Sequence, residues 1–339
     1  MTHIQNSIKS VLAGNTLSQK EAFNSIKEIM NGEATDAQIG AFIAATRMAG
    51  ITPALIAGAA QAMRNNMRPV KSPDPITVDI VGTGGDGAHT FNISTSSAFV
   101  IAGAGVTVAK HGSYGVSSKC GSANVQSELG INIQYSPEKM EEALEKIGIA
   151  FLFAPGLHPA MKNVIGPRRE LGAWSLFNIL GPLCNPASAR YGMLGVFSEE
   201  LVPVVADACI ELDMKHVYVV HGQDGLDELS ISAPSTVTLV KDGKTENMTV
   251  TPEEFGLKTA DIRELVGGEP AENAQIVRDL FSGKIQGPKR DVVLLNSAFA
   301  IVSAGKAETI EEGIKAAALS IDSGAALSKL DQLVELSNS

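Results

Sequence analysis

Short apolar segments that favour β-structure alternate with helical stretches through most of the chain after residue 76. The candidate buried strands are residues 77–81, 106–109, 149–153, 194–196 and 217–220. Helical stretches such as 94–104 separate most of them, a pattern typical of βαβ units and a largely parallel sheet. Residues 236–250 differ, because the Asp-Gly pair at 242–243 separates two alternating runs and predicts an antiparallel hairpin. Residues 298–318 and 325–336 are expected to be helical.

The first seventy residues carry the signals that begin and end helices. Ser18 and Glu21 have the spacing of a capping box, and a second box follows at 35–38. Thr52 is a further N-cap candidate, with proline at the first helical position after it. The sequence therefore predicts a small helical bundle, serving as a structural cap or a subunit interface. The proline-rich segment 68–75 is the expected linker out of it.

The composition limits the classes of partner. Of the 339 residues, 44% are hydrophobic but only 5% are aromatic, so the core must be largely aliphatic, which suits buried parallel strands under helices. The net charge of −10 argues against a broad nucleic-acid contact and against an anionic membrane surface. A local phosphate pocket stays possible, because exposed charges more than about 8 Å apart are screened at physiological salt.

Cysteine usage and the polar N-terminal segment predict a reducing, cytoplasmic setting. Cys120, Cys184 and Cys209 are odd in number and have no metal-ligand spacing. The chain does not begin with a basic segment followed by an apolar stretch, so we expect no signal peptide. Its most apolar stretch, 98–109, is too short and too rich in glycine to span a bilayer.

Residues 82–87 read Gly-Thr-Gly-Gly-Asp-Gly, follow a candidate strand and match the G-x-G-x-x-G spacing of dinucleotide-binding folds. Two features disfavour that interpretation. The acidic residue expected about twenty positions later is absent, and Lys110 and His111 occupy that region. Asp86 also places a carboxylate inside the loop, where it would repel a diphosphate unless a cation or a ribose hydroxyl accepts it. We therefore expect a diphosphate loop rather than a nicotinamide site.

Two further loops favour anion binding. Residues 90–95 lead into a helix, where Ser94 and Thr95 are N-cap residue types and where free N–H groups also make a ready phosphate site. Residues 110–122 contain glycines, paired serines and two lysines, so that Lys110 would supply charge and the serines would supply direction. Simple helix capping and an ordinary surface loop are the alternatives.

The segment 158–172 contains a proline, Pro167, that predicts the start of a short helix with Arg168 and Arg169 in its first turn. Cations in a first turn oppose the helix dipole. One of the two arginines is therefore a candidate for gripping a carboxylate or phosphate in bidentate fashion. A solvated arginine pair is the alternative.

Residues 221–228 follow a buried-strand candidate and carry three carboxylates. Mg²⁺ prefers oxygen ligands and binds through one or two carboxylates together with substrate phosphates. A solvated acidic turn is the alternative. Beside three anion-binding loops, Asp227 and Glu228 are expected to be the magnesium partners of a diphosphate.

Taken together and in order, these motifs resemble the anthranilate phosphoribosyltransferase family, which catalyses the second step of tryptophan synthesis after chorismate. The resemblance runs from the N-terminal helices through the C-terminal region. It is densest at GTGGDG (82–87), NIST (92–95), KHG (110–112), SSKCGSANV (117–125), HPAMKNV (158–164), RRELG (168–172), FNILGPLCNPA (177–187) and DGLDE (224–228).

The resemblance implies an α/β fold in which a small N-terminal helical domain joins a large, mostly parallel α/β domain, as in nucleoside phosphorylases and phosphoribosyltransferases. The helical domain would span residues 1–71, be completed by about 158–190, and mediate a homodimer. Residues 75–157 and 191–339 would bind 5-phosphoribosyl 1-diphosphate (PRPP). The implied reaction transfers the phosphoribosyl group to the amine of anthranilate and releases pyrophosphate. Two Mg²⁺ ions are expected, and neither nucleic acid nor a membrane is an expected partner.

Site residues follow from the resemblance position by position. The PRPP-binding set would be Gly82, Gly85, Asp86, Thr90, Asn92, Ile93, Ser94, Thr95, Lys110, Ser118 and Ser122. The anthranilate-binding set would be Gly82, His111, Ser113 and Arg168. Metal ligation would fall to Ser94, Asp227 and Glu228. No Ser-His-Asp or Cys-His arrangement is seen, and no catalytic base is assigned, although His111 is a candidate for one.

The chain departs from the family pattern around the acceptor. Ser113 stands where the family usually has Asn, Tyr114 where Arg is frequent, and Trp174-Ser175 where Arg-Thr is usual. Serine is shorter than asparagine and offers one hydroxyl instead of an amide, which predicts a reshaped or wetter acceptor pocket. A pyrimidine nucleoside phosphorylase-like enzyme, a nucleic-acid-binding paralogue of the same fold and a dehydrogenase are the alternative functions.

Overall fold

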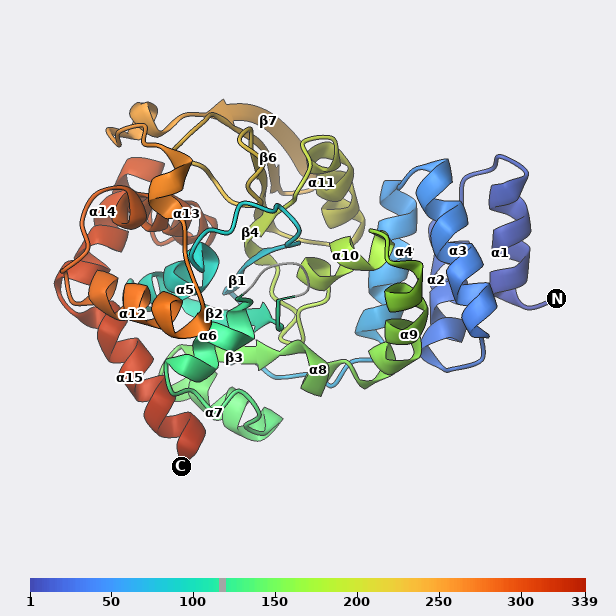
Figure 1. The fold of residues 1–339 in the computed structure, drawn as a ribbon, viewed down its shortest axis with the longest axis horizontal. Coiled ribbons are helices and arrows are strands. Elements are labelled where there is room, and N and C mark those ends of the chain that lie inside the picture. The colour runs from blue at the N-terminus through green and yellow to red at the C-terminus, as the bar shows by residue number, and fades with distance from the viewer. Residues whose placement is uncertain (116–119) are drawn as a thin grey trace.

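One seven-stranded sheet runs through the molecule, and helices cover both of its faces (Figure 1). The structure is a computed structural model that describes residues 1–115 and 120–339. The strands are β1 (Thr77–Gly82), β2 (Thr107–Gly112), β3 (Ile149–Phe153), β4 (Tyr191–Gly195), β5 (His216–Gly222), β6 (Ser235–Lys241) and β7 (Lys244–Val250). The predicted hairpin is confirmed as β6 and β7, with Asp242 and Gly243 both at positive φ in its turn.

The order of the strands creates a switch point at β1. The sheet runs β3-β2-β1-β4-β5-β6-β7, and its first five strands are parallel, as predicted. From β1 the chain proceeds to β2 on one side and returns later to β4 on the other side. At such a reversal the connections that leave two neighbouring strands run to opposite sides, and ligands of open α/β sheets bind outside the carboxyl ends of these strands. The glycine loop at 82–87 begins at this point.

Helices fill the rest of the fold. The α-helices are α1 (His3–Leu12), α2 (Gln19–Met30), α3 (Asp36–Ala49), α4 (Pro53–Arg64), α5 (Ile93–Gly103), α6 (Ser122–Glu128), α7 (Pro137–Lys146), α8 (Ala154–Leu157), α9 (Lys162–Leu171), α10 (Leu176–Leu180), α11 (Leu201–Glu211), α12 (Pro270–Phe281), α13 (Pro288–Ser303), α14 (Ile310–Asp322) and α15 (Ala325–Asn338). The short 3-10 segments are η1 (Pro159–Met161), η2 (Gly181–Leu183), η3 (Pro252–Phe255) and η4 (Ile262–Leu265). Both predicted capping boxes, at the starts of α2 and α3, are confirmed. None of the described helices is long and apolar enough to cross a membrane.

The two faces of the sheet belong to two hydrophobic cores. Along β5, Val217 and Val219 contact the core shared with α4, α11 and the N-terminal helices. Tyr218 and Val220 point to the other face, where they join the core built around α5 and α13. Figure 1 shows the blue helices α1–α4 at one end of the molecule, with α9 and α10 beside them although these follow β3 in the chain.

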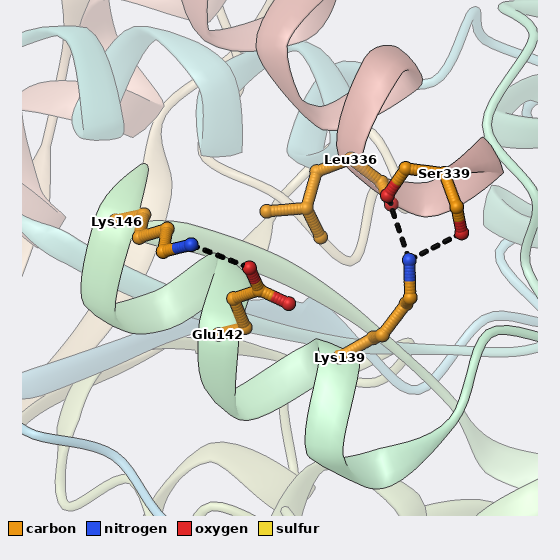
Figure 2. Close-up of polar contacts among 5 residues, drawn as sticks. All are labelled: Lys139, Glu142, Lys146, Leu336 and Ser339. Carbon is orange, nitrogen blue, oxygen red and sulfur yellow. Dashed lines mark hydrogen bonds and ion pairs between the residues drawn. The ribbon is translucent and has the colours of Figure 1, made fainter.

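The C-terminal helix α15 closes the face of the sheet that α5 covers. At the end of α15, the hydroxyl of Ser339 accepts a hydrogen bond of 2.7 Å from the ammonium of Lys139 on α7, and the carbonyl of Ser339 accepts another from the same ammonium (Figure 2). Helix α7 also carries the Glu142–Lys146 pair at 2.6 Å, an exposed i,i+4 interaction of small energetic effect. Packing of Leu330 and Leu333, which are fully buried, therefore contributes more to the docking of α15 than these surface contacts.

One local prediction was wrong, and the structure refines two others. Pro167 lies inside α9 rather than at its start, because the helix begins at Lys162, so Arg168 and Arg169 occupy its last turn and complement the helix dipole instead of opposing it. Ser94 and Thr95 are first-turn residues of α5, and Asn92 is its N-cap residue, without a side-chain cap bond. The stretch 298–318 is divided between α13 and α14 by a turn, so it is not one helix.

The close crossing of α2 and α4 generates a stability prediction. A Cβ atom on Gly58 would lie 2.2 Å from the backbone oxygen of Gln19, so Gly58→Ala should destabilise the protein by about 1–3 kcal/mol through overpacking. Gly40, also within a bundle helix, has open space around its Cα, so Gly40→Ala is the matched control and should be neutral or stabilising by up to about 1 kcal/mol. Denaturant unfolding measures both changes, and equal effects would contradict the packing argument.

Candidate active site

Two adjacent carboxylates lie beside the switch point. Asp227 and Glu228 follow β5, and each residue is only 8% exposed. The Oδ2 atom of Asp227 accepts a hydrogen bond of 2.6 Å from the backbone N–H of Gly84 in the glycine loop. The Oε1 atom of Glu228 accepts one of 3.2 Å from the backbone N–H of Ser94 at the start of α5. The predicted acidic pair is therefore buried against two of the predicted anion-binding loops.

Two glycines make room for this acidic pair. A Cβ atom on Gly82 would lie 2.1 Å from the Oδ2 atom of Asp227, and one on Gly195 would lie 1.6 Å from the backbone oxygen of the same residue. Gly82 ends β1 and Gly195 ends β4, the two strands that meet at the switch point. Any larger residue at either position would force the carboxylate segment away from the sheet edge.

The acidic residues here repel one another and have little water to screen them. Burial, and then the neighbouring charge of Asp86, raises the pKa of Asp227, while burial and the charge of Asp227 raise the pKa of Glu228. Burial also raises the pKa of Asp86. Lys110 is the cation that faces Asp227 and Glu228, and burial lowers its own pKa even so. The site therefore carries more buried negative charge than its own cation balances.

This donor set fits a magnesium ion that is shared with a substrate. Among the described residues, no three His, Cys, Asp or Glu side chains converge closely enough to hold a metal ion by themselves. Mg²⁺ in a site with one or two carboxylates completes its coordination with water and substrate phosphates. The excess of buried carboxylate and the oxygen-only ligand set suit that arrangement.

Hydrogen bonds fix the two ends of the glycine loop. At its start, the N–H of Thr83 donates to the carbonyl of Gly195 at 3.0 Å. Beyond the loop, Thr90 forms a β-bridge with Val266. The amide of Asn92 then donates to the carbonyl of Cys120 at 3.2 Å. Gly85 and Asp86 lie between these anchored ends, with Gly85 exposed and Asp86 partly buried.

The N-terminus of α5 supplies further polar groups. Ile93 is fully buried, and its N–H bonds locally to the carbonyl of Phe91 at 2.7 Å. The hydroxyl of Thr95 is buried and has no hydrogen-bond partner among the described residues. A buried hydroxyl without a partner costs free energy unless a ligand or water satisfies it. Thr95 therefore fits a phosphate-binding role better than the capping role that its residue type also predicts.

Of the remaining phosphate-binding candidates, Lys110 lies on β2 and Ser122 lies at the start of α6. Lys110 is 2% exposed, and its ammonium donates to the carbonyl of Ile80 at 2.7 Å. The hydroxyl of Ser122, at the start of α6, donates to the carbonyl of Ser113 at 3.2 Å. Ser118 lies outside the described residues.

Two imidazole rings lie together beside Lys110. His111 is the residue after Lys110 on β2, and its ring centroid lies 5.1 Å from that of His158, which precedes η1. The Nδ1 atom of His111 lies 3.2 Å from the carbonyl of Gly181, whereas the Nε2 atoms of both rings are buried without a partner among the described residues. Burial lowers the pKa of His111 to about 3 and that of His158 to about 4, so both rings are neutral at pH 7.

Arg168 lies in the last turn of α9 and contacts α10, which ends next to Gly181, the partner of His111. Its guanidinium carbon lies 5.7 Å from the centroid of the Phe177 ring, and burial lowers its pKa. Ser113 is exposed. Of the other departures from the family pattern, Tyr114 packs edge-on against Phe153 at 5.2 Å. Trp174 lies in the same loop as Ser175 and packs against Arg47 and Phe197 (5.9 and 5.0 Å).

Asp79 is a buried carboxylate that the sequence motifs do not predict as a site residue. It contacts both the strand that carries Lys110 and His111 and the segment after α10. Asp79, in the middle of β1, accepts bonds from the backbone N–H of His111 at 3.1 Å and from the amide of Asn185 at 2.6 Å. Burial raises the pKa of Asp79 to about 6. The Asn185 amide also donates to the carbonyl of Ala109 at 2.8 Å. The available signal was a carboxylate inside a run that otherwise reads as a buried strand.

The fold and the site define a class of protein. A family model described as the α/β domain of a glycosyl transferase family matches residues 74–327, and one described as the helical bundle domain of a glycosyl transferase family matches residues 5–67. The chain thus belongs to the glycosyl transferases that combine these two domains.

Full-length relatives narrow the assignment. The anthranilate phosphoribosyltransferases of Desulfosudis oleivorans and of Anaeromyxobacter sp. (strain K) are 49% and 51% identical to this chain, with 98% of each chain covered in both cases. The crystal structure of the Thermus thermophilus enzyme has a TM-score of 0.94 at 39% identity, covering 98% of this chain and 99% of that one. The Saccharomyces cerevisiae enzyme in complex with PRPP and Mg has a TM-score of 0.91 at 30% identity, covering 99% and 98%. The chain belongs to the anthranilate phosphoribosyltransferase family.

The buried acidic pair predicts how stability depends on pH. The pKa of Glu228 is raised from 4.5 to about 8, so the folded protein holds this proton more tightly than the unfolded chain and stability falls as pH rises through that interval. Glu228→Gln should therefore stabilise the Mg²⁺-free protein at pH 8, by about 1 kcal/mol or more, and have little effect at pH 4.5. Thermal unfolding at both pH values measures this, with the exposed Glu335→Gln as the control. A gain of equal size at both pH values would contradict it.

Proposed function

We propose that the loops around Asp227 and Glu228 carry out the reaction of this family, the transfer of the phosphoribosyl group from PRPP to the amine of anthranilate. The observation that carries the proposal is the burial of this acidic pair between the glycine loop and the N-terminus of α5. A diphosphate with its magnesium supplies the positive charge that the pair lacks and the negative charge that the loop N–H groups accept.

The donor would be bound by the residues that the sequence predicts for it. They are Gly82, Gly85, Asp86, Thr90, Asn92, Ile93, Ser94, Thr95, Lys110, Ser118 and Ser122. Support comes from the convergence of the described members of this set on the carboxyl edge of β1 and β2. The Saccharomyces cerevisiae relative in complex with PRPP and Mg supports the same donor and ion.

Magnesium would be held by Ser94, Asp227 and Glu228, and we expect two ions. When bound, the ions would neutralise charge on the departing diphosphate. The backbone N–H groups of Gly84 and Ser94 already hold the two carboxylates in place, so little rearrangement of the chain is needed to present them.

Anthranilate would lie against Gly82, His111, Ser113 and Arg168. Arg168 forms none of the ion pairs recorded among the described residues, so its charge is free to receive the substrate carboxylate. The neutral imidazoles of His111 and His158 would pack against the aromatic ring of the acceptor without adding charge. The Saccharomyces cerevisiae relative in complex with 4-fluoroanthranilate supports an acceptor of this kind.

Catalysis would rest on positioning and on charge stabilisation. An aromatic amine is a weak nucleophile, so the C–O bond to the diphosphate must be largely broken, giving the anomeric carbon oxocarbenium character, before the new C–N bond forms. His111, with a pKa of about 3, is too weak a base to remove the amine proton at neutral pH. The carboxylate of the substrate itself, beside the amine, is the better acceptor for it.

The subunit and domain arrangement is proposed on separate grounds. The helical domain would comprise residues 1–71 completed by about 158–190, with residues 75–157 and 191–339 as the α/β domain. Large apolar side chains are exposed on three helices of the bundle, at Leu12, Met48 and Ile165, and these suit a homodimer interface. Three buried free cysteines suit work in the reducing cytoplasm.

An assay of transfer tests the proposed function. Protein incubated with PRPP, Mg²⁺ and anthranilate should consume the fluorescent anthranilate, and Asp227→Ala and Glu228→Ala should each reduce the rate by roughly 100-fold or more, since each removes stabilisation of the leaving group. Glu335→Ala is the control on the surface. A folded protein without transfer at any Mg²⁺ concentration would contradict the proposed function. Cleavage of pyrimidine nucleosides with phosphate, regardless of Asp227 and Glu228, would favour a nucleoside phosphorylase.

The departure at Ser113 generates a separate prediction. Ser113→Asn restores the residue that the family usually has, so it should lower the KM for anthranilate several-fold and leave the KM for PRPP unchanged, because the longer amide carries two N–H donors and a carbonyl acceptor where serine has one hydroxyl. Steady-state kinetics with each substrate varied in turn measures the change. An unaltered or higher KM for anthranilate would show that Ser113 does not loosen the acceptor site.

A further inference from the structure

Arg168 is held by neighbours that do not neutralise it. Its Nη2 atom donates to the Oδ1 atom of Asn178 at 3.3 Å, and its guanidinium lies over the Phe177 ring at 5.7 Å. None of the ion pairs recorded among the described residues includes Arg168. An arginine that is only structural would gain more from an acidic partner, because a charge-assisted pair is stronger than a bond to a neutral amide.

Asn178 is itself fixed from the other side. Its Oδ1 atom also accepts bonds from the backbone N–H of Ser175 at 3.1 Å and from the Ser175 hydroxyl at 3.3 Å. Three donors thus converge on one amide oxygen, which ties the loop before α10 to the last turn of α9. The position of the guanidinium then follows from the capping of α10, ten residues away in the chain.

We propose that Asn178 is a positioning residue that aims Arg168 at the carboxylate of the acceptor while leaving its positive charge unpaired. The inference rests on the proposed function and extends it, since it names the residue that makes the acceptor site selective for an aromatic amine with a carboxylate. An aspartate at position 178 would make the same three contacts but would occupy Arg168 as an ion-pair partner.

Asn178→Asp separates positioning from folding. The aspartate keeps the acceptor for Ser175, so the melting temperature should stay within a few degrees of that of the unsubstituted protein. The KM for anthranilate should rise about 10- to 100-fold, the range that loss of a hydrogen bond to a charged group predicts, while the KM for PRPP changes less than about twofold. Asn15→Asp, the same chemical change at an exposed loop position between α1 and α2, is the matched control, and both KM values should stay within about twofold.

A second background tests whether Asn178 acts through Arg168. In Arg168→Ala protein, adding Asn178→Asp should change kcat/KM for anthranilate less than about twofold, since contacting residues are not additive when one acts through the other. Asn178→Ala provides a variant without the new charge and should raise the KM for anthranilate more than that for PRPP.

An unchanged KM for anthranilate in Asn178→Asp would overturn the inference, as would an equal loss in Asn15→Asp. Absence of transfer in the unsubstituted protein would overturn the proposed function instead.

Discussion

Burial of two adjacent carboxylates at the edge of a parallel sheet is the constraint on which the rest of the site depends. Two charges that repel each other out of water are costly, and they persist only where hydrogen bonds and a cation compensate them. The N–H groups of Gly84 and Ser94 supply the hydrogen bonds, and Lys110 supplies part of the charge. A magnesium diphosphate brings both signs of charge, so it fits the charge balance that the two carboxylates and Lys110 leave incomplete.

The fold explains why these groups meet. Strand order reverses at β1, and the glycines that end β1 and β4 let the acidic segment after β5 pack against the carboxyl ends of both strands. In Figure 1, α9 and α10 lie beside the N-terminal helices, and Gly181, directly after α10, contacts His111 on β2. Under the proposed function, the donor-binding groups come from the sheet edge. Arg168, proposed to bind the acceptor, comes from α9, which follows β3 but packs with the N-terminal helices.

Sequence patterns predicted those structural features that depend on local chemistry. Capping boxes, the Asp-Gly turn and the buried strands were predictable because each depends on residues within a few positions. The start of α9 was not, since tertiary packing extends that helix five residues before the proline. Long-range polar contacts were also beyond the sequence. Asn185 binds Asp79 across 106 positions, and no periodicity reports such a pairing. The tertiary contacts of Asn178 could not be predicted either, although the motif at 177–187 that contains this residue was recognised.

Strand β2 joins the two halves of the site, because successive residues on a strand point to opposite sides. Lys110 faces the acidic pair, and His111 faces His158 and the carbonyl of Gly181. Asp79 accepts from the backbone between them, so a single buried carboxylate on β1 fixes the register of both. The charged Lys110 and the neutral His111 are thereby held at a constant offset. A reaction whose catalysis is mainly positioning needs that fixed offset more than it needs a strong base.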